Sequence, residues 1–536
     1  MCTNIMLDLV MGMLDIAFLG LLLLVINFYT NGNSLNNRFL LQSIAGKNSL
    51  VVISIFFMLF SLKNWLGYRV SRSQNFFFYG VASRLSKRNI WHYLNDDYTR
   101  FINIDSSVFI RKISQQPIEF SCYILTNIQQ VISQSILIFF TIIGILFYHP
   151  ESFLLLFLLL LPPVILLAFF IKKKLKHVRA NIKITSQKTI QHLQESLSGY
   201  VESNIYHKND FFTDRFYRYK QQLDENIATQ QTLQILPARL IEVFAVLGFF
   251  ILIAINKLSA NAPAIDLLTI GIFMAAAYKI IPGIIKILNS TGQIKTYQFT
   301  LNDLLLLESK TPIADDIPPA SGINSIEFDH VYFRYNEHAI LSDVNFQIAK
   351  GDFAGISAAS GKGKTTIINL LLGFLGPDCG AICLNGQKTD NAGRQQYWTR
   401  ISYVKQQPFF IHDTILKNIT LSDDKYDWDK LQDVLLFCGI DQLLDNSREG
   451  PEKIIKENGK NISGGQRQRI MLARALYHDF DLLILDEPFG EIDDRSEKNI
   501  LVKLQALARQ GKMILFITHK KTSLSFCNKI FSLDEE

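Results

Sequence analysis

The apolar residues of this chain are concentrated in its first half, where they form six long runs. Each run is close in length to the roughly 20 residues that a helix needs to cross a bilayer. After residue 310 such runs largely disappear. The runs span residues 5–28, 49–68, 129–149, 152–171, 238–257 and 265–289. At 536 residues the chain is also too long for one core. We therefore expect a multidomain protein, with an all-α six-helix transmembrane domain over residues 1–308 and a soluble domain after it.

Basic residues in this first half lie mainly between the apolar runs. Two long connections, 69–115 and 172–236, hold most of them, although the net charge of the whole chain is only +6. Loops rich in Lys and Arg stay on the cytoplasmic side of a membrane, so both long loops and both termini are predicted to be cytoplasmic. This pattern indicates membrane topology and argues against a nucleic-acid partner. The six cysteines are scattered along the chain and are interpreted as reduced thiols.

Several charged residues fall inside or beside the predicted spans. Asp15 in the first span and Glu242 in the fifth are costly in lipid, so we expect both to face the interior of the helix bundle. The cations have two interpretations: their side chains extend to the cytoplasmic interface, or they line a cavity that attracts an anionic head group. These cations are Lys63, Arg69, Arg72, Arg239, Lys279 and Lys286.

A linker that contains three prolines, residues 309–324, separates the two halves. Strand and helix patterns alternate after it, which predicts an α/β nucleotide-binding domain over residues 325–536.

In this second half a glycine-containing loop follows the strand Phe353–Ile356 and precedes a helical run, Ile367–Leu372. The backbone N–H groups of such a loop hold phosphates; Lys364 is expected to reach the β- and γ-phosphates, and Thr365 to bind Mg²⁺. The residues predicted to bind ATP here are Ala358, Ser360, Gly361, Lys362, Gly363, Lys364, Thr365 and Thr366.

A second motif is an apolar strand that ends in two acids, Asp486 and Glu487. This is the Walker B pattern, which is common when it stands alone but specific when it follows a phosphate-binding loop. Asp486 is expected to orient Mg²⁺, and Glu487 to polarise the water that attacks the γ-phosphate.

The deciding motif lies just before that strand, at Ile462–Gln466. It resembles the LSGGQ signature of the ABC ATPases, and the chain as a whole resembles a half-transporter of the ABC exporter type. The resemblance implies an ATPase coupled to transport, with ATP and Mg²⁺ as cofactors. It implies that the signature of one subunit closes on the ATP held by the other. The signature residues are Ser463, Gly464, Gly465 and Gln466.

The same resemblance gives roles to four further residues. Tyr335 is similar to the aromatic residue that stacks on adenine, and Asp493 to the aspartate of the D-loop. Gln406 matches the glutamine that contacts Mg²⁺ and takes part in catalysis, and His519 matches the histidine that senses the γ-phosphate. By position, the loop tips near Asp105–Lys112 and Tyr206–Asp210 resemble the segments that touch the ATPase in such exporters.

The ATPase half departs from the family pattern in places. Ala358 replaces the first glycine of the phosphate loop, at a cost of about 1–2 kcal/mol if the position needs a positive φ. In the D-loop, Gly490-Glu491-Ile492 replaces the usual Ser-Ala-Leu. We expect weakened nucleotide affinity from the first change. Since the sequence stops soon after His519, we also expect the closing strands of the family to be trimmed.

The membrane half most resembles bacterial lipid-linked oligosaccharide flippases. Pro237–Glu242 resembles the opening of their fifth span, Tyr278–Pro282 an element of their sixth, and Asp15 lies where they tend to carry an acid. The resemblance implies a flippase for a lipid or lipid-linked glycan in the bacterial inner membrane, working with a second half-transporter chain. A homodimer is the simpler arrangement, and a heterodimer stays open. The alternatives are export of a peptide or small hydrophobic compound, and a regulatory membrane ATPase that does not pump.

Overall fold

The computed structural model divides the chain into two compact units. One comprises Met1–Asp96 and Ile102–Thr311, and the other Asp97–Phe101 and Pro312–Glu536. We call the first the helical unit and the second, after the prediction from the sequence, the ATPase unit. The structure describes residues 2–30, 50–95, 98, 104–148, 169, 178, 181–258, 267–308, 322–335, 337–357, 361–423, 425–440, 450–456 and 459–533.

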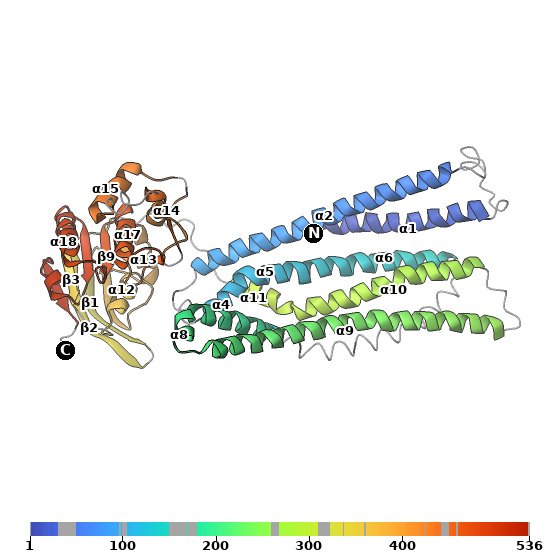
Figure 1. Ribbon diagram of the computed structural model, residues 1–536, viewed down its shortest axis with the longest axis horizontal. Helices are drawn as coiled ribbons and strands as arrows, with labels where there is room; N and C mark the ends of the chain where they lie inside the picture. Colours follow the sequence, from blue (N-terminus) through green and yellow to red (C-terminus); the bar gives the residue numbers. More distant parts are fainter. Residues whose placement is uncertain are drawn as a thin grey trace. The chain divides into compact units, whose positions relative to one another are not determined.

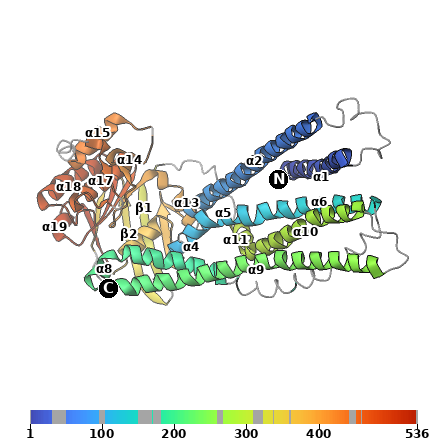
Figure 2. The ribbon, with the colours of Figure 1, turned by 45° about the vertical axis from the view of Figure 1, so that its right-hand side comes forward.

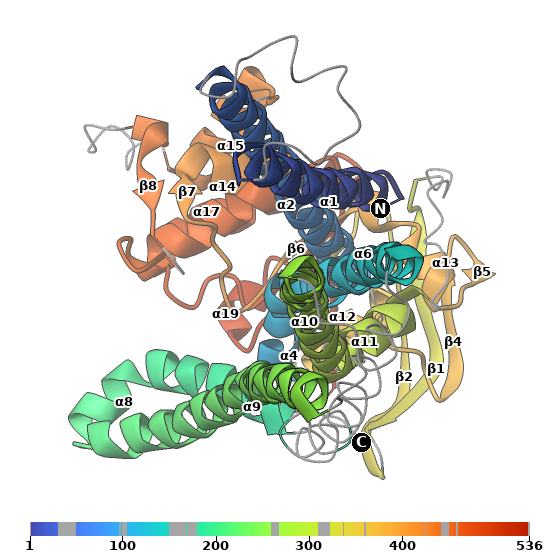
Figure 3. The ribbon, with the colours of Figure 1, turned by 90° about the vertical axis from the view of Figure 1, so that its right-hand side faces the viewer.

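The helical unit is built from long helices joined by short ones (Figure 1). The long helices whose bounds the structure gives are α1 (Cys2–Thr30), α2 (Val51–Leu94), α6 (Thr126–Tyr148), α9 (Asn209–Leu258) and α10 (Leu267–Thr296), and residues 181–198 are helical as well. The short ones are α4 (Ser106–Ile110), α5 (Gln116–Glu119), α8 (Tyr200–Ile205) and α11 (Gln298–Glu308). Helix α10 lies between α6 and α9, and α1 lies beside α2, as Figures 2 and 3 show from two further directions.

The five long helices cover five of the six apolar runs. The fourth run, 152–171, lies outside the described residues except for Phe169. Within the described part, three stretches are long and apolar enough to cross a membrane: Thr3–Leu22, Val51–Leu94 and Ser106–Ile143. The count of six spans and the boundaries 1–308, 309–324 and 325–536 remain predictions.

Two acidic residues of α1 have defined partners in the helical unit. Asp15 forms a salt bridge with Lys63 of α2, so Lys63 has an acidic partner that neither sequence interpretation of the cations included. Asp8 accepts hydrogen bonds from Gln74 of α2 and from Gln129 and Ser133 of α6, at 2.7, 2.6 and 2.9 Å. These contacts tie three helices together. The side chains of Glu242 and Lys279 lie outside the described residues.

The ATPase unit contains two large sheets of different kinds, besides the short pair β7 (Asp413–Thr414) and β8 (Ile454–Ile455). An antiparallel sheet has the order β2-β1-β4-β5, and a parallel sheet has the order β11-β3-β10-β9-β6. The first is made of β1 (Ser325–Tyr335), β2 (His338–Ala349), β4 (Cys379–Leu384) and β5 (Gln387–Lys388). The second is made of β3 (Phe353–Ser357), β6 (Ile401–Val404), β9 (Leu482–Asp486), β10 (Met513–Ile517) and β11 (Lys529–Ser532). Strand β11 shows that a closing strand does follow His519, since it pairs with β3.

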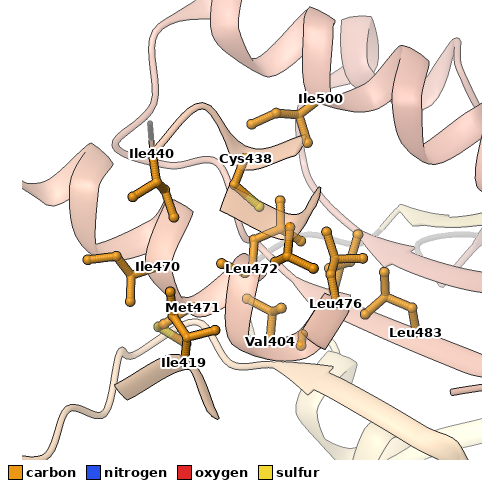
Figure 4. Packing of buried hydrophobic residues seen from close by; sticks show 14 of the residues in the cluster. Val404, Ile419, Cys438, Ile440, Ile470, Met471, Leu472, Leu476, Leu483 and Ile500 are labelled. Carbon is orange, nitrogen blue, oxygen red and sulfur yellow. The ribbon is translucent and has the colours of Figure 1, made fainter. Parts of the chain in front are cut away.

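Helices cover both faces of the parallel sheet, and its side chains alternate between two cores. Leu483 and Phe516 point into one core with α14 (Ile415–Thr420), α15 (Trp428–Cys438), α17 (Gly464–Tyr477) and α18 (Asp494–Arg509). Figure 4 shows this core, where Leu472 and Leu476 of α17 lie against Val404 and Leu483 of the sheet. Ile484 and Leu515 point the other way, into a core with α12 (Lys364–Leu371) and the antiparallel sheet. Because both faces are buried, the central strands are continuously apolar, and their ends are held rigidly in place.

Candidate ATP-binding and hydrolysis site

The phosphate-binding loop joins β3 to α12, which begins at Lys364, three residues earlier than the sequence indicated. Gly363 caps this helix with φ +83°, and a Cβ there would lie 2.6 Å from Cδ2 of Leu341. Only glycine fits such a position, which also lets ligand phosphates approach the backbone. Lys362 and Thr365 are exposed, and Thr366 is buried. Ala358 and Ser360 lie outside the described residues, so their places in the loop remain predictions.

The two acids follow the buried strand β9. Asp486 is its last residue and is only 5 % exposed. Burial, and secondly the neighbouring Glu487, raise the pKa of the Asp486 carboxyl above its ordinary value. Glu487 lies just beyond the strand, with φ +47°, and its N–H donates to the carbonyl of Ile517 at 3.0 Å. This backbone bond fixes the turn that carries the Glu487 carboxylate out of the sheet.

Three side chains from separate elements converge on Glu487. Nζ of Lys364 lies 2.5 Å from Oε1, and Nε2 of Gln406 donates to Oε2 at 2.7 Å. Nδ1 of His519 lies 3.7 Å from Oε1. Burial raises the pKa of Glu487, but Lys364 and His519 outweigh it and hold that pKa below its ordinary value. Glu487 is therefore ionised at neutral pH.

The residues predicted to hold Mg²⁺ line one cavity of about 390 Å³. Thr365, Gln406 and Asp486 all border it. Tyr403 also borders it, and its hydroxyl lies 3.5 Å from Oδ2 of Asp486. No cluster of three His, Cys, Asp or Glu side chains occurs among the described residues. A Mg²⁺ ion here would accordingly be held by a carboxylate, a hydroxyl and phosphate oxygens, which is the usual mixture for this ion.

Tyr98 borders the same cavity, although it comes from the first long loop of the sequence. The segment Asp97–Phe101 groups with the ATPase unit, and the Tyr98 ring stacks on Phe374 at a centroid distance of 4.4 Å. The loop tips expected to touch the ATPase, Asp105–Lys112 and Tyr206–Asp210, belong to the helical unit, and their role remains a prediction.

Tyr335 ends β1 and is 42 % exposed. The ring meets Phe333 edge to face, at a centroid distance of 4.9 Å. Burial raises the pKa of the Tyr335 hydroxyl, and hydrogen bonding with Thr366 and Asn369 of α12 opposes that rise. The residue thus lies next to the first helix of the phosphate loop with part of its ring accessible, as stacking on a base requires.

The signature residues begin α17. Ser463 caps this helix: its hydroxyl accepts from the N–H of Gln466 at 3.3 Å, and Oε1 of Gln466 accepts from the N–H of Ser463 at 3.0 Å. This reciprocal capping box fixes the helix start and leaves the amides of Gly464 and Gly465 at its positive end. The described contacts of these four residues do not include Lys364 or Glu487. One chain therefore presents its phosphate loop and its signature separately.

Asp493 caps α18, and Oδ1 accepts from the N–H of Ser496 at 2.9 Å. That bond contributes most to holding the pKa of the Asp493 carboxyl below its ordinary value.

The neighbouring Glu491 was noted in the sequence only as a D-loop replacement. In the structure its carboxylate lies against Gly464, where a Cβ would be 1.4 Å from Oε2. Only the unusual residue type at position 491 hinted at this contact.

Comparisons with known proteins agree with an ATP-binding site in the C-terminal half of the chain. The family model described as "ABC transporter" matches residues 341–490. The chain is 29 % identical to a probable ABC transporter ATP-binding/permease protein of Haemophilus influenzae, over 43 % of this chain and 42 % of the relative. It is 27 % identical to the ATP-dependent lipid A-core flippase of Burkholderia pseudomallei over 64 % and 58 %, and 30 % identical to that of Ralstonia nicotianae over 54 % and 49 %. The chain thus spans about half the length of these curated relatives.

A solved structure extends the likeness to the whole fold. The bacterial Atm1-family ABC exporter with ATP bound superimposes with a TM-score of 0.82 at 17 % identity, covering 99 % of this chain and 93 % of the other. The predicted fold class, a helical domain followed by an α/β ATP-binding domain, is confirmed. Residues 341–490 of this chain match the ABC transporter family model, and the chain as a whole shares the fold of the solved exporter.

Proposed function

We propose that the chain is half of an ATP-hydrolysing exporter or flippase that moves an amphiphilic substrate, a lipid or lipid-linked glycan, across the bacterial inner membrane. The observation that carries the proposal is the convergence of Lys364, Gln406 and His519 on the Glu487 carboxylate, beside the buried Asp486. The stretches long and apolar enough to cross a membrane, and the relatives named lipid A-core flippase, support the membrane and lipid parts. The proposal places both termini in the cytoplasm, because the two long basic loops flank the spans on that side.

The residues present fit a nucleotide with Mg²⁺. The glycine turn at 363 admits phosphates, and Asp486 is a buried carboxylate that a cation would stabilise in its ionised form. Bound Mg²⁺ neutralises charge on the phosphates. Thr365 and Asp486 are the proposed ligands, with Gln406 beside them.

Lys364 and Glu487 have opposite tasks in this proposal, although they are paired in the structure. Lys364 turns from the carboxylate to the phosphates, which frees an oxygen of Glu487. The Glu487 carboxylate then accepts a hydrogen bond from the attacking water and orients it. Gln406 and His519 stay within reach of Glu487 and hold it in place.

One chain supplies one phosphate loop and one signature, on α12 and α17. We propose that two copies associate so that ATP lies between Lys364 and Glu487 of one copy and Ser463 of the other. This arrangement uses the amides at the start of α17 as an anion site. A homodimer is sufficient, because the chain carries every part of the site.

The test is ATP hydrolysis and lipid translocation by the purified chain in proteoliposomes. A lipid A-type glycolipid should raise the hydrolysis rate and become accessible in the opposite leaflet, and neither should occur with Glu487→Gln. If the glycolipid leaves the rate unchanged while peptides raise it, the chain exports peptides instead. If translocation persists in Glu487→Gln, the protein does not pump by hydrolysis.

A further inference from the structure

Glu491 lies where the signature meets the D-loop of the same chain. Its N–H donates to Oε1 of Gln468 at 2.9 Å, which fixes the backbone, and Oε2 accepts from Nη2 of Arg467 at 3.0 Å. The side chain covers Gly464 so closely that any Cβ at that position would clash. A carboxylate is therefore built into the surface of the signature, half exposed to solvent.

In the free chain the negative charge of this carboxylate is stabilised by its contacts, but the same charge would disfavour the binding of ATP at the signature. It lies near the start of α17, whose positive end attracts anions, and it pairs with Arg467. A γ-phosphate that approaches Ser463 and Gly464 would meet a negative charge beside its binding amides. Unless a further cation arrives with the phosphate, the two anions repel each other. Oε1 of Glu491 has no hydrogen bond within the described part of the chain, and it can accept one from such a cation.

Lys362 is a cation suited to that place. It lies between two glycines of the phosphate loop, Gly361 and Gly363, two residues before Lys364. Lys362 is exposed and takes part in no salt bridge or hydrogen bond with the described residues. Its neighbour Gly361 has φ +82° and open space around it, so the loop surface is accessible to a second chain.

In the proposed ATP sandwich the two residues belong to surfaces that face each other. The proposed sandwich puts the phosphate loop of one copy against Ser463 and Gly464 of the other. Lys362 belongs to the first surface, and Glu491 covers the second. We propose that Lys362 of each copy pairs with Glu491 of the other, and that this pair makes the closed dimer selective for a second copy of this chain. The inference rests on the proposed ATP-sandwich function.

Two-fold symmetry makes the arrangement self-complementary, because the pair then forms twice with identical partners. A different half-transporter without an acid at the position of Glu491 would leave Lys362 unpaired. A chain without a cation at position 362 would leave Glu491 facing the phosphate. Complementary charge thus supplies specificity more than affinity.

Charge exchange tests the pair in the full-length chain. Lys362→Glu and Glu491→Lys each place like charges across the interface, and each should lower the ATP hydrolysis rate at least about tenfold. The double variant restores opposite charges and should recover to within about threefold of the wild type. Lys362→Gln separates this effect from direct phosphate binding, since it should be milder than Lys362→Glu and should not be rescued by Glu491→Lys.

Mixing the two single variants makes the test specific for contact between chains. When the Lys362→Glu chain pairs with the Glu491→Lys chain, one site holds the exchanged pair and the other the native pair. Co-expressed single variants, isolated as the mixed dimer by two affinity tags, should therefore regain activity that neither has alone. A contact within one chain would give no such recovery.

The outcomes separate this inference from the proposed function. If the wild type hydrolyses ATP and Glu487→Gln does not, but neither the double variant nor the mixed dimer recovers, then the Lys362–Glu491 pair is wrong and the proposed function stands. If Glu491→Ala is faster than the wild type, the carboxylate merely obstructs the signature, and the pair is again wrong. If Glu487→Gln hydrolyses ATP like the wild type, the proposed function fails and the pair fails with it.

Discussion

The two units of this chain use polar side chains for opposite purposes. In the ATPase unit the core is apolar and fully buried, and the charged groups gather at strand ends, where Lys364, Gln406 and His519 reach Glu487. In the helical unit many large apolar side chains are exposed, and polar contacts such as those of Asp8 join the helices. Because apolar packing already holds the backbone of the ATPase unit, the charged side chains at the strand ends are available to bind ligands and act in catalysis. In the helical unit, where large apolar side chains are exposed, hydrogen bonds such as those of Asp8 help to hold the helices together.

The largest expected difference concerns buried and exposed phenylalanines. Phe516 of β10 is fully buried, whereas Phe57 of α2 is 70 % exposed. Phe516→Ala should lower the free energy of unfolding of the ATPase unit by about 3–5 kcal/mol, because it leaves a cavity in a packed core. Phe57→Ala should change stability by less than about 1 kcal/mol, since no protein core surrounds it.

Thermal unfolding of both variants in detergent measures this contrast. Ile500→Val, a milder change in the same core as Phe516, serves as a control and should cost about 0.5–1.5 kcal/mol. Equal effects of Phe516→Ala and Phe57→Ala would show that the two units are not stabilised differently.

A second, smaller effect is expected at Asp8. Asp8→Leu removes the acceptor for Gln74, Gln129 and Ser133 and leaves the buried amide of Gln129 without a partner. The free energy of unfolding of the helical unit should fall by about 1–3 kcal/mol as a result. Asp8→Asn keeps an acceptor and should cost less. Unfolding in detergent checks both, and a Leu variant as stable as the wild type would mean that these contacts do not hold the helices together.

The smallest effect concerns pH and Asp352, which precedes β3. Its carboxylate accepts from the N–H of Ala349 and from Nζ of Lys529, both at 2.8 Å, and from Nδ2 of Asn528 at 3.0 Å. Burial raises the pKa of Asp352, but these three donors outweigh it and leave that pKa below its ordinary value. A carboxyl whose pKa is lower in the folded state stabilises the protein fully above its unfolded pKa of about 4. This stabilisation is lost as the pH falls through the folded pKa.

Asp352→Asn should therefore lower stability by about 1 kcal/mol at neutral pH, a figure that allows for the solvent exposure of Lys529. Stability of the variant should also fall less than that of the wild type on acidification below about pH 4. Asp433→Asn, an exposed position on α15, is the matched control. Chemical denaturation at several pH values measures the difference, and parallel curves for wild type and Asp352→Asn would contradict the assignment.

The sequence predicted the parts of the molecule that local patterns encode. Apolar runs mark the long helices, and the order of phosphate loop, signature and acidic strand end identified the ATP-binding domain. The positions of Lys364, Asp486 and Glu487 follow from such patterns, because each comes at a fixed place beside a strand or helix.

Contacts between distant segments could not be predicted in this way. Tyr98 stacks on Phe374, and Glu491 covers Gly464, through tertiary packing that leaves no periodic trace in the sequence. Asp8 lies in an apolar run, where an acid requires a partner, but its three donors come from helices far along the chain. The partner of Lys63 was missed for the same reason.

The central claim is that Glu487 orients the water that hydrolyses ATP. The most direct measurement compares ATP hydrolysis and nucleotide binding of the wild type and Glu487→Gln in the same proteoliposomes, with the exposed Glu452→Gln as a control. The account predicts a fall in the hydrolysis rate of at least about 100-fold for Glu487→Gln, with nucleotide binding retained and no change for the control. A rate within about twofold of the wild type would contradict it.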